Sequence, residues 1–126
     1  MLRFSYKPML LMMWLALIIT ALNYWRVWYQ LPARMAVHFG ANFQPNSYTS
    51  REAAAELGLG IMAVLLLLFT IAGLIAHAMK PPAAWPMLLV FYVVVGILWY
   101  GNYSVLRFNL NRLAPHPPPV NITIPR

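Results

Sequence analysis

The sequence contains no cysteine and almost no acidic residues. Without cysteine the chain cannot form disulfides, cysteine-ligated zinc sites, iron–sulfur clusters or a cysteine nucleophile. Glu52 and Glu56 are the only acids against nine lysines and arginines, which gives a formal net charge of +7. The basic residues flank apolar stretches and form no basic run. We therefore expect contact with anionic lipid headgroups and no nucleic-acid partner.

Charge of either sign is scarce. Charged residues make up 9% of the chain and hydrophobic residues 62%, whereas soluble domains carry about 25% charged residues. The apolar stretches contain no Asp, Glu or Lys and no interior Arg, which proton relays, pumps and transport sites normally need. No base is paired with a nucleophile. We therefore expect a non-enzymatic membrane protein without a small-molecule substrate.

Three apolar stretches, at about 9–29, 57–79 and 85–105, are long enough to cross a bilayer. About 20 residues of α-helix span a hydrocarbon core of about 30 Å. The predicted fold class is an all-α membrane protein with three transmembrane helices in residues 1–108. An ordered polar loop at 30–50 joins the first two helices, and a Pro-rich tail at 109–126 is expected to be extended.

The helix ends carry recognisable sequence patterns. Thr49 and Glu52 have the spacing of a capping box, which predicts Thr49 as the N-cap of the second helix. Pro86 suits the first turn of the third helix, because proline has no N–H to leave unpaired there. A tight turn at 80–84 is then expected between these two helices.

Three spans place the loop and the tail on the same side of the membrane, but the charge rules for orientation conflict. Six arginines flank that side and three basic residues flank the other. The first helix usually dominates, and Arg3 and Lys7 precede it. We therefore expect a multi-pass membrane protein with the N-terminus inside and the loop and the tail outside.

Two histidines are candidate ligands, and each also has a structural interpretation. His38 could bind a metal together with Glu52 or Glu56, or could sense pH. The interpretation we favour is that it hydrogen-bonds the loop backbone. His77 could ligate haem or chlorophyll, but we favour a role at the helix end beside Lys80. We predict no catalytic residues, no metal and no cofactor beyond lipids.

Small residues in the second and third stretches predict close helix packing. Ala54 and Gly58, and likewise Ala72 and Ala76, are spaced four apart, so each pair lies on one face of the second helix. Such pairs let helix backbones approach closely in membranes. Gly96 is expected to play the same part on the third helix.

The loop carries a short ordered series of residues that we take as its interaction residues: Leu31, Pro32, His38, Phe39, Pro45, Asn46, Tyr48 and Arg51. In order and spacing it is similar to the short domain of unknown function at the start of SdpI-type bacterial immunity proteins. The sequence departs from that pattern where Phe43 replaces a glycine, Tyr48 a tryptophan and Arg51 a lysine. The resemblance implies a bacterial inner-membrane protein with an ordered loop, and implies no reaction. With the orientation expected above, the loop and the tail would face the periplasm.

These features favour a role in protein–protein contact. Our first hypothesis is an accessory subunit of a larger bacterial membrane complex, respiratory or photosynthetic, with the Pro-rich tail clamping other membrane subunits. The alternative is a free-standing SdpI-like factor that binds a toxin or a regulator at the membrane. A third hypothesis is a pigment- or haem-ligating subunit that uses His77.

Overall fold

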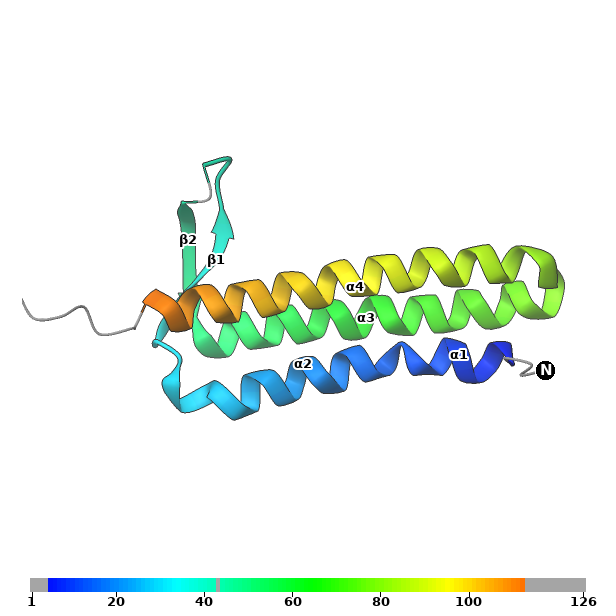
Figure 1. The fold of residues 1–126 in the computed structure, drawn as a ribbon, viewed down its shortest axis with the longest axis horizontal. Helices are drawn as coiled ribbons and strands as arrows, with labels where there is room; N and C mark the ends of the chain where they lie inside the picture. The colour runs from blue at the N-terminus through cyan, green and yellow to red at the C-terminus, as the bar shows by residue number, and fades with distance from the viewer. Residues whose placement is uncertain (1–4, 43, 113–126) are drawn as a thin grey trace, which may run out of the picture.

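The computed structural model describes residues 5–42 and 44–112. Three long helical segments run side by side in an elongated bundle, and a β-hairpin stands across one end of it (Figure 1). Each segment is long and apolar enough to span a bilayer: Tyr6–Gln30, Arg51–Met79 and Pro81–Asn111. The prediction of a mostly helical fold with three transmembrane helices is confirmed.

The first span is interrupted at Met13. It consists of α1 (Tyr6–Met12) and α2 (Trp14–Val27), followed by the 3₁₀ turn η1 (Trp28–Gln30). The hydroxyl of Tyr92, from the third span, donates a hydrogen bond of 2.6 Å to the carbonyl of Met9. In a regular helix that carbonyl would accept from the amide of Met13. The Met13 amide instead bonds the carbonyl of Leu10, so a side chain inserted into the backbone ladder accounts for the interruption.

The second span, α3 (Arg51–Met79), begins one residue later than the capping pattern predicted. Ser50 is the N-cap, and its hydroxyl accepts from the Ala53 amide at 3.1 Å. The prediction of Thr49 as N-cap was wrong, because β2 continues one residue further, through Ser50, and the helix begins only at Arg51. Ser50 is the last strand residue, and its side chain is the one that reaches the first turn of the helix.

The third span, α4 (Pro81–Arg112), begins directly after Lys80. The expected start near residue 85 was wrong, because Pro81 and Pro82 end α3 and also occupy the first turn of α4, where no N–H is required. Pro86 therefore lies inside the helix. At its other end α4 extends beyond the expected boundary at 108 to Arg112. The remainder of the predicted tail, residues 113–126, lies outside the described residues.

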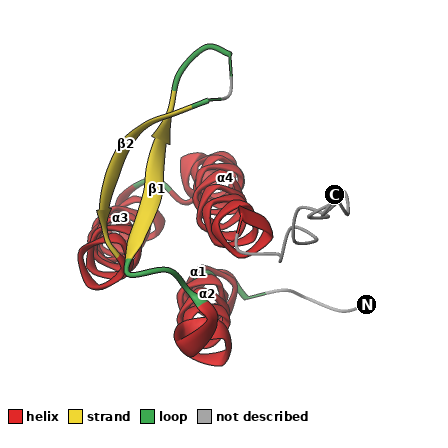
Figure 2. Cartoon of the chain, turned by 90° about the vertical axis from the view of Figure 1, so that its left-hand side faces the viewer, coloured by secondary structure: helices red, strands yellow, loops and turns green. Residues whose placement is uncertain are grey.

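The ordered loop between α2 and α3 is a β-hairpin. Its strands, β1 (Arg34–Phe39) and β2 (Pro45–Ser50), pair antiparallel, and the Gly40 amide bonds the Gln44 carbonyl across the turn. Phe43 is not among the described residues. The hairpin lies across the helix axes, over α3 and α4, and extends past them on the side away from α2 (Figures 1 and 2). In a bilayer it would therefore run along the membrane surface.

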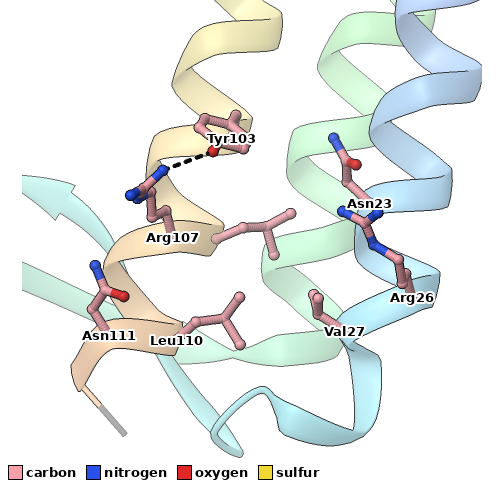
Figure 3. Close-up of a pocket in the computed structure, with 8 residues that line it drawn as sticks. Asn23, Arg26, Val27, Tyr103, Arg107, Leu110 and Asn111 are labelled. Atoms are coloured by element: carbon pink, nitrogen blue, oxygen red, sulfur yellow. Dashed lines mark hydrogen bonds between the residues drawn. The ribbon is translucent and has the colours of Figure 1, made fainter. Parts of the chain in front are cut away.

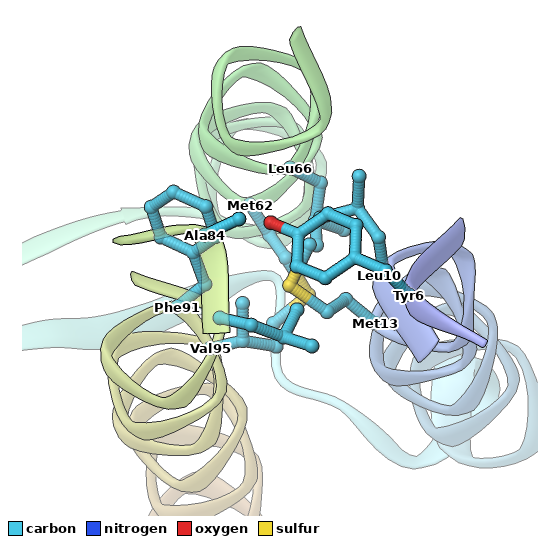
Figure 4. Packing of buried hydrophobic residues seen from close by; sticks show 9 residues of the cluster. Tyr6, Leu10, Met13, Met62, Leu66, Ala84, Phe91 and Val95 are labelled. Atoms are coloured by element: carbon cyan, nitrogen blue, oxygen red, sulfur yellow. The ribbon is translucent and has the colours of Figure 1, made fainter. Parts of the chain in front are cut away.

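Two buried clusters hold the bundle together. The larger one joins all three spans near the turn between α3 and α4 (Figure 4) and contains Tyr6, Leu10, Met13, Met62, Leu66, Ala84, Leu88, Phe91 and Val95. The second lies at the hairpin end and contains Tyr24, Leu31, Met35, Ala54 and Leu106. Because Met35 belongs to β1, the second cluster ties the hairpin to the helices.

Candidate functional site

The hairpin leaves the bundle and returns to it at the same place. Arg34 pairs with Ser50 at its base, and the Arg51 amide bonds the carbonyl of Ala33 at 3.1 Å. The ends of α2 and α3 could therefore be joined by a much shorter connection. The median connection between elements of a compact domain is only about 4–6 residues long. The hairpin is an additional structure built onto the connection.

Asn109 anchors the hairpin to α4. Its side chain is fully buried. The Oδ1 atom accepts from the Ala36 amide at 2.8 Å, and Nδ2 donates to the Ala36 carbonyl at 2.9 Å and to the Val105 carbonyl at 2.8 Å. The side-chain amide thus completes the free edge of β1 as a neighbouring strand would. Each of these buried polar atoms has a partner, so burial of the asparagine carries no penalty for an unpaired group.

Aromatic and apolar contacts reinforce this anchor. The ring of Phe39 packs edge-to-face on Phe108, one residue before Asn109, with ring centroids 5.0 Å apart. Met35 and Ala36 of β1 are fully buried, and Leu31, which precedes the hairpin, is buried as well. The hairpin is therefore held by side chains along β1, whereas β2 is the outer strand.

Arg51 fixes the base of the hairpin to the end of the first span. Its guanidinium lies over the ring of Trp28 at 5.2 Å. It also donates to the carbonyls of Trp28 and Leu31, at 3.4 and 3.5 Å, and forms an ion pair with Glu52 at 3.2 Å. The Leu31 carbonyl follows the end of η1, where backbone acceptors lack intrahelical partners, and the Trp28 carbonyl also accepts from the Leu31 amide. Arg51 therefore joins α2, the hairpin and α3.

His38 lies on β1 and is exposed. Its Nδ1 atom is 2.6 Å from Oδ1 of Asn46 on the opposite strand, which brings together two of the predicted loop residues. Within residues 5–42 and 44–112, no three His, Asp or Glu side chains gather in a group that could hold a metal. The structure thus gives His38 a cross-strand hydrogen bond to a side chain, where we had expected one to the backbone.

The other loop residues take different positions. Pro32 precedes β1 and is partly buried, and Pro45 is the first residue of β2, opposite Phe39. Tyr48 is 43% exposed on β2. It lies with Asn46 and Ser47 on the strand that faces away from the bundle. The structure therefore divides the predicted loop residues between an anchored strand and an exposed one.

A groove of about 530 Å³ lies between the hairpin and the outer faces of α3 and α4. Most of its lining is aliphatic, and its polar side chains are His38, Tyr24 and Asn102. The Tyr24 hydroxyl donates to Oδ1 of Asn102 at 3.3 Å, and the Asn102 amide donates to the carbonyl of Leu98 at 3.1 Å. The groove offers apolar surface with a few fixed polar groups, a lining typical of binding pockets.

Gly58 makes this polar contact between helices sterically feasible. A Cβ atom at Gly58 would collide with Oδ1 of Asn102 and would lie 3.2 Å from the Tyr24 hydroxyl. Ala54, one turn earlier on α3, is buried in the cluster at the hairpin end. Ala72 and Ala76 are partly buried against the larger cluster.

Gly96 does not lie where we expected. It is exposed, and a Cβ atom built there meets nothing within 4 Å. It lines a hollow between the first span and α4, so within the described residues it contributes no close approach. Gly73, which the sequence analysis overlooked, takes that role: a Cβ atom there would lie 2.7 Å from Cδ1 of Leu10 and 2.9 Å from the Tyr6 hydroxyl.

His77 lies near the far end of the bundle from the hairpin. Its ring stacks on that of Tyr6, with centroids 4.6 Å apart and planes at 2°. Trp85 meets the same tyrosine edge-on at 5.4 Å. The described residues thus show His77 in an aromatic cluster to which all three spans contribute.

Residues 11–63 match the family model of a domain of unknown function, DUF1648. A DUF1648 domain is found here. The matched segment begins in α1, contains the whole hairpin and ends in α3. Asn109 and Phe108, which anchor the hairpin, lie on α4 outside the DUF1648 match. No curated protein and no solved structure matches the chain.

Together the DUF1648 match and the three spans define the chain as a small multi-pass integral membrane protein. The sequence indicated the ordered loop but not its anchor on α4. Asn109 stands in an Asn-Leu-Asn segment directly after the third apolar stretch, and this polar segment was the one available signal. We had assigned it to the tail.

Proposed function

We propose that this protein is a non-enzymatic protein of the bacterial inner membrane that acts by protein–protein contact, with the hairpin as its contact element. The observation that carries the proposal is the anchoring of β1 by Asn109. A simple connection between α2 and α3 would need neither the hairpin nor a buried asparagine that pairs with its edge. Loops that are fixed in this way on a rigid scaffold commonly carry function.

The exposed strand supplies the contact surface. Asn46, Ser47 and Tyr48 are exposed, and within the described residues β2 pairs only with β1. The outer edge of β2 can therefore receive an extended segment of another protein, which is a recurrent mode of peptide recognition. The partner would approach along the membrane surface, on the side that we propose to be periplasmic.

The DUF1648 match favours a free-standing factor of the SdpI type. DUF1648 occurs in SdpI-type proteins, and the match contains the whole hairpin. In this version the hairpin binds a toxin or a signalling protein that reaches the membrane. The chain itself needs no other subunit for this role.

A different observation favours the alternative, an accessory subunit of a larger membrane complex. Gly60, Gly96 and Gly101 have open space where a Cβ atom would stand, and Gly96 and Gly101 are exposed. Exposed glycines on transmembrane helices let a further helix approach closely. In this version respiratory or photosynthetic subunits pack on α3 and α4.

The third alternative, a pigment- or haem-ligating subunit, rests on His77. It predicts that the purified chain or its complex absorbs in the visible range and that His77→Ala loses this absorption. An unchanged spectrum in His77→Ala would reject it.

One purification experiment tests the proposal. The tagged chain is isolated in mild detergent from its native membrane, together with Asn109→Leu and the matched control Asn111→Leu, which changes an exposed asparagine on the same helix. We expect a stoichiometric partner with the unmodified chain and the control, and loss of the partner with Asn109→Leu. A single soluble partner supports the factor, and a set of membrane subunits supports the accessory role. Equal recovery with all three chains would refute contact through the hairpin.

A further inference from the structure

A second, smaller pocket lies between α2 and α4 on the side of the bundle away from the groove. Its volume is about 240 Å³. Asn23 and Arg26 from α2 line one wall, and Tyr103 and Arg107 from α4 line the other (Figure 3). Leu106, which is buried, forms part of its apolar lining.

The pocket combines two cations with no acid. Neither of the two acids of the chain lines it. The Tyr103 hydroxyl accepts a hydrogen bond of 3.0 Å from Nη1 of Arg107 (Figure 3), which holds that guanidinium beside the pocket. Among the described residues the one ion pair is between Arg51 and Glu52, so the charges of Arg26 and Arg107 have no counter-ion in this part of the chain.

The position of the pocket is that of the lipid headgroups. Arg26 lies in the last turn of α2, and Arg107 lies near the end of α4. Trp25, beside Arg26, is 77% exposed, as expected for an aromatic side chain at the membrane interface. Both arginines thus lie at one interface. On α2, Leu22, about one turn from Arg26 toward the bilayer core, is an exposed apolar residue.

Helix dipoles oppose an anion here, which makes the two arginines necessary. The C-terminal end of a helix carries about half a negative charge, and both α2 and α4 end near the pocket. Two guanidinium charges exceed the negative charge of about one unit at the two helix ends together, whereas a single guanidinium would only about cancel it. An anion should therefore bind when both arginines are present and much more weakly when either is missing.

We propose that this pocket binds the phosphate group of an anionic phospholipid. Guanidinium groups match phosphate oxygens through paired N–H donors, and the Asn23 amide adds a further donor beside Arg26. Basic pockets between transmembrane helices are known to receive phosphate headgroups. Free phosphate has the same chemistry, but a lipid also places its acyl chains against exposed apolar side chains of the spans, such as Leu22 of α2. This inference is independent of the hairpin and its partner.

The test measures lipid retention by native mass spectrometry. The full chain is released from nanodiscs of phosphatidylcholine with either phosphatidylglycerol or oleate as the anionic component. Arg26→Gln and Arg107→Gln are compared with Arg34→Gln, which removes the same charge from the hairpin at the same end of the bundle. We expect selective retention of phosphatidylglycerol, at least about tenfold weaker in each pocket variant and unchanged in Arg34→Gln.

Three results would overturn the proposal. Equal retention of oleate would mean that any anionic amphiphile binds. An equal loss in Arg34→Gln would mean that general surface charge is responsible. Thermal stabilisation of the detergent-solubilised chain by inorganic phosphate, without stabilisation by phosphatidylglycerol, would rule out the lipid as the source of the phosphate. Circular dichroism of each variant shows that the helices have formed.

Discussion

Asn109 pairs with the edge of β1 because its side-chain amide both donates to and accepts from the backbone of Ala36. An aliphatic residue of similar size would pack in the same space and leave two buried backbone groups unpaired. Each such group costs roughly 1–3 kcal/mol. A single side chain therefore decides whether the hairpin is fixed on the bundle or free to move away from it.

The first prediction follows from this bond pair. In Asn109→Leu we expect hydrogen exchange of the Ala36 amide to accelerate by at least about 30-fold, because unpairing the two backbone groups of Ala36 makes opening of β1 easier by about 2–6 kcal/mol. Exchange in the middle of α3 should stay as it is. Asn111→Leu is the control and should leave the Ala36 amide protected. Unchanged protection in Asn109→Leu would show that the apolar contacts alone hold the hairpin.

At the scale of the elements, the packing of α3 depends on which of its glycines faces a neighbour. Gly58 faces Asn102, whose amide is held at both ends by Tyr24 and by the carbonyl of Leu98. Gly60 is on the same helix and has nothing within 4 Å of a built Cβ atom. The two positions therefore form a matched pair for one substitution.

We predict that Gly58→Ala lowers the free energy of unfolding by about 1–3 kcal/mol, the usual cost of overpacking. Gly60→Ala should be neutral or stabilising by up to about 1 kcal/mol, because alanine is the better helix former. Unfolding by SDS in mixed micelles, followed by tryptophan fluorescence, measures both variants. Equal stability of the two would mean that Asn102 rearranges at no cost.

The sequence predicted the spans well because apolar stretches of this length have few alternatives to membrane helices. It did not predict the hairpin. Residues 35–37 of β1 are all apolar, and β2 is almost entirely polar, so neither strand shows the alternation that identifies strands. The stability of the hairpin depends on Asn109, which is 73 positions from Ala36, and no local pattern reports a contact of that range.

The local sequence pattern also did not determine the helix boundaries at the prolines and at the N-cap. Pro81 and Pro82 indicate both the end of one helix and the start of the next, and the sequence alone does not say how closely these two ends follow each other. Thr49 and Ser50 are adjacent residues with similar capping ability. Because β2 continues through Ser50 and the helix begins at Arg51, Ser50 is the residue that caps it.

For the molecule as a whole, three spans separate the hairpin from the junction of α3 and α4 by the full length of the bundle (Figure 1). Because the chain has no cysteine, single cysteines can report the side of the membrane without background. Asn42→Cys places the thiol at the exposed tip of the hairpin, and Ala83→Cys places it at the exposed junction.

We predict that a membrane-impermeant maleimide labels Asn42→Cys in intact cells and labels Ala83→Cys only after the membrane is permeabilised. The reverse result would be consistent with three spans but would place the hairpin in the cytoplasm, which would contradict the orientation that we propose. Labelling of both positions from the same side would contradict the three-span topology itself.

The central claim is that the anchored hairpin is the surface through which this membrane protein meets its partner, and photo-crosslinking tests it most directly. A photoreactive amino acid replaces Ser47 on β2, and in a parallel chain it replaces Ile75, a lipid-exposed residue of α3 far from the hairpin. We predict a discrete protein adduct from position 47 in native membranes, lost when Asn109→Leu is added and kept with Asn111→Leu. Adducts from position 75 alone, or adducts from position 47 that survive Asn109→Leu, would contradict the account.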